Sequence, residues 1–205
     1  MNLLAVTKTC PGVSVRQAVA AGQRDFGENY VQEAVGKIAE LADLRARIRW
    51  HLIGPLQSNK AREVAAHFDW VHAVDRMKLA QRLSDLRPPE LPPLQVCLQV
   101  NISGEDSKSG VAPEAALALA REVATLPRLK LRGLMAIPEP EGDLAAQRAP
   151  HRALRKLFEA MNAEGLGLDT LSIGMSADLE AAIAEGATWV RIGTAIFGSR
   201  PMKSD

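Results

Sequence analysis

A lysine ends the first apolar stretch of the chain. The stretch LLAVTK at residues 3–8 finishes in Lys8, and the turn-forming residues Pro11 and Gly12 follow shortly after it. This pattern predicts a short buried strand whose last side chain is an amine. Desolvation at such a place lowers the pKa of a lysine, so that its free amine can attack a carbonyl carbon. The alternative is a lysine whose stem packs on the edge of the fold while its ammonium group stays in water.

Small and hydroxyl-bearing residues follow the last two predicted strands. The connections after these strands contain Gly174, Met175, Ser176, Gly193 and Thr194. Glycines let backbone N–H groups approach an anion closely, and a serine at the start of a helix can either cap the helix or donate its hydroxyl group to a phosphate. The connections therefore predict a phosphate pocket, with turn glycines and a plain helix cap as the alternative.

An amine and a phosphate pocket together call for a ligand that carries both an aldehyde and a phosphate. Pyridoxal 5'-phosphate (PLP) and a phosphorylated sugar aldehyde both meet this requirement. Arg191 alternates with Val190 and Ile192, so it points to the opposite side of its strand. If that side is the ligand pocket, the guanidinium group, which donates but does not accept, holds a ring nitrogen as an unprotonated acceptor. Such a partner for the pyridine nitrogen is one known arrangement for PLP, and the alternative is an arginine that faces solvent.

The composition is that of a globular protein with one sizeable domain. The chain has 205 residues, of which 47% are hydrophobic and 24% are charged, and its net charge is +1. A charge so close to zero indicates neither a nucleic acid nor an anionic membrane as a partner. No apolar run approaches bilayer length and no signal peptide precedes Leu3, so we expect a cytoplasmic protein. Cys10 and Cys97 lack metal-binding spacing and fit a reducing cytosol as passive thiols.

Short apolar runs alternate with helical patterns along the chain. The runs predict strands at residues 3–8, 25–28, 50–54, 70–74, 94–100, 129–137, 170–174 and 189–192. Amphipathic spacing and capping residues predict helices at 15–21, 30–44, 58–67, 76–86, 113–125, 149–163 and 177–185. Asn29 and Ser176 are the expected N-caps of two of these helices. Alternation of this kind predicts right-handed crossovers and a parallel sheet.

Eight such strands favour a single-domain (β/α)8 TIM barrel over residues 1–205. The Pro-rich segment 88–93 is short and leads straight into a strand, so we interpret it as a stiff loop within this domain. A doubly wound sheet is the alternative, but it would favour a glycine-rich fingerprint after the first strand, which the sequence lacks. In a barrel, the active end is where the strands run into the following loops. Lys8 reaches that end, Asn29 follows the second strand, and His51 lies within the third.

Long motifs of the chain resemble those of the pyridoxal phosphate homeostasis protein family. The matching segments run nearly from end to end: LAVTKT at 4–9, FGENYVQE at 26–33, WHLIGPLQSNK at 50–60, SKSG at 107–110, GLM at 133–135, GMS at 174–176 and VRIGTAIFG at 190–198. The resemblance implies a barrel like the N-terminal domain of alanine racemase and a role in intracellular PLP homeostasis.

The resemblance also implies the roles of the site residues. Lys8 would form a Schiff base with PLP, Arg191 would face the pyridine nitrogen, and the phosphate would bind at the loops after the last two strands. Asn29 and His51 lie in matching motifs and complete the set of cofactor-binding candidates. This set is Lys8, Asn29, His51, Met175, Ser176, Arg191, Gly193 and Thr194.

A PLP-binding protein without substrate turnover is the favoured interpretation. A pyridine nitrogen paired with arginine is a poor electron sink for carbanion chemistry. The second, β-rich domain with which alanine racemases supply a tyrosine has no counterpart here, and Tyr30 is the only tyrosine. The alternatives are a PLP-dependent amino-acid racemase or lyase and a Schiff-base aldolase acting on phosphosugars. We expect a monomer that hands PLP to apo-enzymes, with Lys108 either a transient acceptor of the cofactor or a solvated loop lysine.

The resemblance implies a helix ahead of the first strand, and here that strand lies at the very start of the sequence. Residues 199–205 follow the last strand and its loop, and they are too few for a good closing helix. We therefore expect the seam between the eighth and first strands to lack a cover and to expose apolar surface. A trimmed start or a partner surface would account for this seam.

Overall fold

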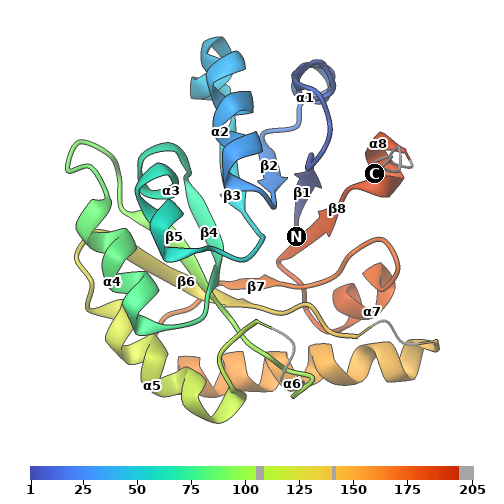
Figure 1. Cartoon of the computed structure of the whole chain (residues 1–205). Helices are drawn as coiled ribbons and strands as arrows, with labels where there is room; N and C mark the ends of the chain where they lie inside the picture. The colour runs from blue at the N-terminus through green and yellow to red at the C-terminus, as the bar shows by residue number, and fades with distance from the viewer. Residues whose placement is uncertain (105–108, 140–141, 199–205) are drawn as a thin grey trace.

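The computed structural model describes residues 1–104, 109–139 and 142–198. Its eight strands form a closed parallel barrel in sequence order (Figure 1). The strands are β1 (Asn2–Val6), β2 (Asp25–Glu28), β3 (Arg49–Leu52), β4 (Trp70–Val74), β5 (Leu94–Gln99), β6 (Leu129–Met135), β7 (Thr170–Ser172) and β8 (Trp189–Ile192). The predicted (β/α)8 barrel is confirmed, and the doubly wound alternative is wrong, because β8 pairs with β1 over four residues and closes the sheet.

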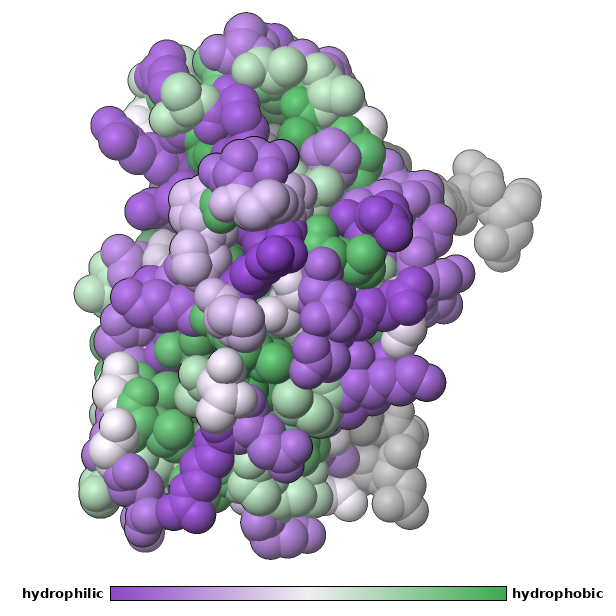
Figure 2. Space-filling view, turned by 90° about the vertical axis from the view of Figure 1, so that its left-hand side faces the viewer, coloured by the Kyte–Doolittle hydropathy of each residue, from purple (hydrophilic) through white to green (hydrophobic). Residues whose placement is uncertain are grey.

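Helices lie outside the barrel and connect its strands (Figure 1). They are α1 (Gly12–Ala20), α2 (Val31–Glu40), η1 (Ala42–Arg47), η2 (Ser58–Lys60), α3 (Ala61–His67), α4 (Met77–Leu86), α5 (Pro113–Ala124), α6 (Leu144–Ala163), α7 (Leu179–Ala184) and α8 (Thr194–Phe197). Each long helix turns a stripe of apolar residues to the strands; α4, for example, buries Leu79, Ala80 and Leu83. On the face shown in Figure 2, hydrophilic side chains are interspersed with hydrophobic ones, as expected for the outer sides of such helices.

Alternation along the strands divides the buried residues into two sets. Ala5, Val190 and Ile192 belong to the large core between the strands and the helices. Their neighbours Leu4 and Trp189 belong to a second cluster, on the opposite side of the same strands. Arg191 has the parity of this inner set, as predicted from its alternation with Val190 and Ile192. The barrel interior is therefore partly polar, and this decides what its mouth can bind.

Several element boundaries differ from the predicted ones. α6 begins at Leu144 rather than near 149, because Asp143 caps it by accepting the Ala146 N–H at 2.9 Å, and Pro150 lies inside the helix. The predicted helix 30–44 is divided into α2 and η1. Ser176 is not an N-cap, since α7 starts only at Leu179. The last difference places Ser176 in the loop between β7 and α7.

The seam between β1 and β8 is covered unevenly. Ala5 of β1 is buried, whereas Leu3, which points to the same side of the strand, is 41% exposed. The expected exposure of apolar surface is therefore present at Leu3, and residues 199–205 lie outside the described part of the chain. No helix within the described ranges is both long and apolar enough to cross a lipid bilayer.

Candidate functional site

A cavity of about 390 Å³ opens at the ends of the strands where the loops begin. This volume lies in the range of small-molecule sites. All the predicted site residues except His51 line it, together with four apolar or small residues. The lining consists of Val6, Lys8, Asn29, Ile53, Ile137, Met175, Ser176, Ala177, Arg191, Gly193 and Thr194. The barrel thus brings the lysine, the arginine and the two phosphate-loop candidates to one place.

The backbone before Lys8 is anchored by a buried ion pair. Lys37 Nζ lies 2.6 Å from Glu28 Oε1, and the two side chains are 4% and 0% exposed. Thr7 joins this pair twice, because its hydroxyl donates to Glu28 Oε1 at 2.6 Å and its carbonyl accepts from Lys37 Nζ at 2.7 Å. Burial raises the pKa of Glu28, and the charge and hydrogen bond of Lys37 partly oppose this. The ion pair fixes the end of β1 from which Lys8 extends.

The backbone after Lys8 is held in an unusual conformation. Thr9 has φ +63°, and within the described residues no other non-glycine residue has a positive φ. Such a conformation costs a β-branched residue about 1–3 kcal/mol. The Thr9 N–H donates to Glu33 Oε1 at 2.5 Å, and Lys37 Nζ also donates to that oxygen at 3.2 Å. The same buried lysine therefore stabilises the chain on both sides of Lys8.

The loop after β7 turns at a position that only glycine fits. Gly174 has φ +91°, and a Cβ atom there would lie 2.5 Å from the Cβ of Ala182 in α7. Both constraints exclude a side chain, the first by backbone strain and the second by packing. Gly174 thus lets the chain turn sharply toward the cavity and places Met175 and Ser176 on its wall.

Asp178 holds the fold of this loop. Its Oδ1 accepts the Met175 N–H at 2.6 Å, and its Oδ2 lies 2.9 Å from His151 Nε2. Burial of Asp178 opposes its ionisation, but the hydrogen bonds from His151 and Met175 outweigh it and lower the pKa of the carboxyl group. Because the Met175 N–H is used within the loop, donors to an anion must come from Ser176 and from the loop after β8, which contains Gly193 and Thr194.

Replacing Asp178 should loosen the loop after β7, which places Met175 and Ser176 on the cavity wall. We expect Asp178→Ala to lower the affinity for PLP about tenfold, because the half-buried Met175 N–H loses its acceptor at a cost of about 1–3 kcal/mol. Titration of the protein with PLP, followed by absorbance, would measure the change. Glu180→Ala removes an equal charge from an exposed position of α7, the helix that follows Asp178, and serves as the control. Equal affinities of the two variants would contradict the role of Asp178.

Arg191 is buried and keeps two N–H groups for a ligand. Its Nη1 donates to the carbonyl and the hydroxyl oxygen of Ser172, the latter at 3.1 Å, and its Nη2 donates to the carbonyl of Ala136 at 2.9 Å. These bonds use three of the five N–H groups of the guanidinium. Burial lowers the pKa of Arg191 to about 10, so the group remains charged at neutral pH. Its contacts within the described residues fix the plane of the guanidinium, and Arg191 lines the cavity.

Asn29 also lines the cavity, and its position depends on a glycine. A Cβ atom on Gly54 would lie only 2.3 Å from the backbone oxygen of Asn29, so the end of β3 can approach this segment only with glycine there. The side-chain Oδ1 of Asn29 is buried and has no hydrogen-bond partner among the described residues. It is an acceptor that a ligand hydroxyl group could satisfy.

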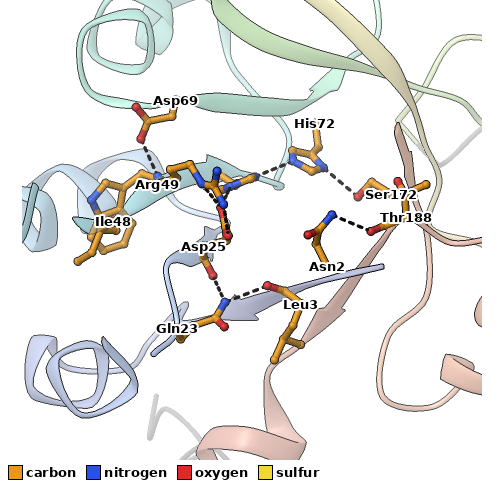
Figure 3. A network of polar contacts seen from close by, with 12 residues as sticks. Asn2, Leu3, Gln23, Asp25, Ile48, Arg49, Asp69, His72, Ser172 and Thr188 are labelled. Carbon is orange, nitrogen blue, oxygen red and sulfur yellow. Dashed lines mark hydrogen bonds and ion pairs between the residues drawn. The ribbon is translucent and has the colours of Figure 1, made fainter. Parts of the chain in front are cut away.

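His51 does not line the cavity. It is 0% exposed, and its ring nitrogens lie 3.1 Å from Asp25 Oδ1 and 3.0 Å from His72 Nε2. The reason is its place along β3: Ile53 lies two residues further toward the mouth on the same side of the chain and occupies the cavity wall instead. His51 lies in the barrel interior, between Asp25 and His72, which are labelled in Figure 3.

The remaining candidates are placed as follows. Cys10 is half-buried, and its Sγ lies 3.8 Å from the carbonyl oxygen of Lys8. Cys97 is buried, and burial raises the pKa of its thiol, which fits a passive role. Lys108 lies outside the described residues. Sequence reasoning missed Glu28 and Lys37 as supports of Lys8, although the spacing of Glu33 and Lys37 by four residues was a usable signal for an ion pair.

Comparison with known proteins agrees with this geometry. The profile of a family described as alanine racemase, N-terminal domain, matches residues 1–201. A pyridoxal phosphate homeostasis protein of Pseudomonas aeruginosa is 66% identical over 200 residues, covering 98% of this chain and 85% of that protein. The chain belongs to the pyridoxal phosphate homeostasis protein family. A second member, from Escherichia coli K12, is 55% identical over 201 residues, covering 98% of this chain and 86% of its own.

Solved structures show the same barrel for this family. PipY of Synechococcus elongatus without PLP has a TM-score of 0.88 at 43% identity and covers 97% of this chain and 93% of its own. The structure of PipY with PLP bound has a TM-score of 0.87 at 42% identity, covering 97% of this chain and 92% of its own. An alanine racemase of Clostridium difficile, at 12% identity and a TM-score of 0.78, shares the fold and covers 99% of this chain and 53% of its own.

Proposed function

We propose that this protein binds PLP covalently through Lys8 and acts in intracellular PLP homeostasis, holding and releasing the cofactor without turning over a substrate. The observation that supports this most directly is that Lys8, Arg191 and residues of the loops after β7 and β8 line one and the same cavity. Membership of a family named for PLP homeostasis, and a relative solved with PLP bound, point to the same ligand.

Each group of the cavity matches one part of PLP. When bound, PLP supplies an aldehyde carbon that condenses with an amine and releases water. Lys8 Nζ is the amine of the cavity, and one of the remaining N–H groups of Arg191 would donate to the pyridine nitrogen. The Asn29 Oδ1 accepts from the ring hydroxyl group. The hydroxyl groups of Ser176 and Thr194 and the backbone N–H groups of the loop after β8 hold the phosphate.

Two features of the site favour a carrier over a racemase or lyase. Arg191 stays charged and cannot give up a proton near neutral pH, so the pyridine nitrogen remains unprotonated and withdraws electrons weakly. Lys8 is also the only general base among the described residues that line the cavity. Tyr30, the only tyrosine of the chain, does not line this cavity. It is 57% exposed and lies in a neighbouring hollow with Gln57 and Lys60. We infer a cytoplasmic monomer that supplies PLP to apo-enzymes.

Borohydride reduction tests this function directly. We expect purified protein incubated with PLP and then reduced to gain one pyridoxyl group, and peptide mass mapping to locate it on Lys8. The reason is that reduction traps a carbon–nitrogen double bond at whichever amine formed it. Modification of other lysines in preference to Lys8, or a protein that stays colourless and unlabelled, would contradict the proposal. A parallel sample that is incubated with PLP but not reduced serves as the control for PLP that is bound non-covalently.

A further inference from the structure

A chain of hydrogen bonds crosses the barrel interior and ends at Arg191. The guanidinium of Arg49 donates two hydrogen bonds to the carboxylate of Asp25, from Nε to Oδ1 at 2.6 Å and from Nη2 to Oδ2 at 2.7 Å. The next links are 3.1 Å from Asp25 to His51, 3.0 Å from His51 to His72, 2.8 Å from His72 to Ser172 and 3.1 Å from Ser172 to Arg191. Figure 3 shows Arg49 and Asp25 at one side and His72 turned toward Ser172. We call these residues the interior network: Arg49, Asp25, His51, His72, Ser172 and Arg191.

The two ends of the interior network fix its direction. Arg191 can only donate, and the ionised carboxylate of Asp25 can only accept. The Ser172 hydroxyl therefore accepts from Arg191 and donates to His72 Nδ1. His72 Nε2–H then donates to His51 Nδ1, and His51 Nε2–H donates to Asp25. Each bridging group then donates one hydrogen bond and accepts one, so the network runs in one direction only when both histidines are neutral Nε2–H tautomers.

Burial and charge support this arrangement. Desolvation lowers the pKa of His51 and lowers that of His72 well below its ordinary value, which keeps both rings neutral. Burial also opposes the ionisation of Asp25, but the hydrogen bonds from His51 and Arg49 outweigh it, so the pKa of the carboxyl group is lowered. The ring of His51 stacks on Trp70 with an interplanar angle of 9°, and this apolar contact separates it from water.

No carboxylate of the described residues forms a hydrogen bond with Arg191, and of these carboxylates only the charge of Asp178 acts on it from a distance. Its hydrogen-bond acceptors within the described residues are two carbonyl groups and one hydroxyl group, although the guanidinium is charged and only 4% exposed. On the basis of the proposed function, we propose that Asp25, His51, His72 and Ser172 are positioning residues that hold the guanidinium of Arg191 through a chain of hydrogen bonds ending on the Asp25 carboxylate. The network orients the guanidinium for the pyridine nitrogen of PLP. Polarisation along a chain of hydrogen bonds strengthens each link, so the effect reaches Arg191 across the barrel.

The first test needs no cofactor. In protein with ¹⁵N-labelled histidine at pH 7.5, long-range ¹H–¹⁵N correlation spectra distinguish the two neutral tautomers and the cation. We expect His51 and His72 both to be Nε2–H tautomers, assigned by loss of each signal in His51→Gln and His72→Gln. A Nδ1–H tautomer or an imidazolium at either position would overturn the proposal, because the network could not then run in one direction.

The second test removes one link at the end nearest the ligand. We expect Ser172→Ala to bind PLP about tenfold more weakly and to shift the absorption maximum of the bound cofactor, because Arg191 and His72 both lose the hydroxyl group. Ser172→Thr should restore the affinity and the spectrum by restoring the hydroxyl. Ser84→Ala removes a buried serine of α4 and is the matched control, with both properties unchanged.

The outcomes separate this proposal from the proposed function. If wild-type protein binds PLP and Ser172→Ala matches it in affinity and spectrum, the interior network has no role at Arg191, while the proposed function stands. If Ser84→Ala shows the same loss as Ser172→Ala, the effect is general destabilisation and the proposal is likewise wrong. Failure of the wild-type protein to bind PLP overturns the proposed function and, with it, the role of the network.

Discussion

Lys8→Ala should abolish covalent capture of PLP completely. No other residue in the described lining of the cavity carries an amine, so no carbon–nitrogen bond should form with the aldehyde there, and borohydride should add no pyridoxyl mass at this site. Some non-covalent affinity should remain, because Arg191, Ser176 and the loop after β8 still match the ring and the phosphate. Intact-protein mass spectrometry after reduction measures the first quantity, and equilibrium dialysis of PLP measures the second.

A matched lysine variant makes this result specific. Lys78→Ala removes an exposed lysine of α4, distant in sequence from the cavity lining, and should capture PLP like the wild type. The same pair of variants also separates the carrier from the racemase alternative. Loss of chirality of an L-amino acid in the presence of wild-type protein and PLP, absent in Lys8→Ala, would show catalytic turnover and contradict the carrier function. A full pyridoxyl label on Lys8→Ala would contradict the assigned role of Lys8.

The barrel could be predicted from the sequence because its signals are local and repeated. Each strand is a short apolar run and each helix an amphipathic stretch, and their alternation along the chain determines the topology. Lys8, Gly174 and Arg191 could be assigned to one site for the same reason. All three lie at or near the carboxyl end of a predicted strand, and closure of the barrel brings these ends into one ring.

The supports of the site could not be predicted because their partners are distant in sequence. His72 and Ser172 are 100 positions apart, and Thr7 and Glu28 are 21 apart. A histidine within an apolar run is predicted to be buried, but its height along the barrel axis depends on the stagger between the strands. The family resemblance of the segment 50–60 makes His51 a cofactor-binding candidate, whereas the structure buries it and places Ile53 on the cavity wall.

Lys37 is the buried residue whose loss should be most damaging. Its ammonium group lies between Glu28, Glu33 and the carbonyl of Thr7, with its side chain 4% exposed. A buried ion pair adds little net stability compared with an apolar pair, but removal of one partner leaves the other charge uncompensated. The carboxylate of Glu28 would remain in the interior, where burial already raises its pKa.

Lys37→Met should therefore reduce the free energy of unfolding by about 3–5 kcal/mol at neutral pH. In this variant native Glu28 retains a proton that the unfolded chain, with an ordinary glutamate pKa of 4.5, has already released. The native state then binds more protons than the unfolded state, so stability should fall as the pH rises above about 5 toward neutrality. Urea denaturation at several pH values measures both effects.

A second substitution should rescue the first if the uncompensated charge is the cause. Lys37→Met/Glu28→Gln has no buried carboxylate at this position, so it should recover part of the lost stability and lose the added pH dependence. Lys156→Met, at an exposed position of α6, is the control for exchanging lysine for methionine in a helix. A pH-independent loss in the single variant, unchanged in the double one, would show that packing rather than charge connects Lys37 to the end of β1. Because Thr7 and Thr9 both depend on this cluster, a charge-based loss should also weaken PLP binding at Lys8.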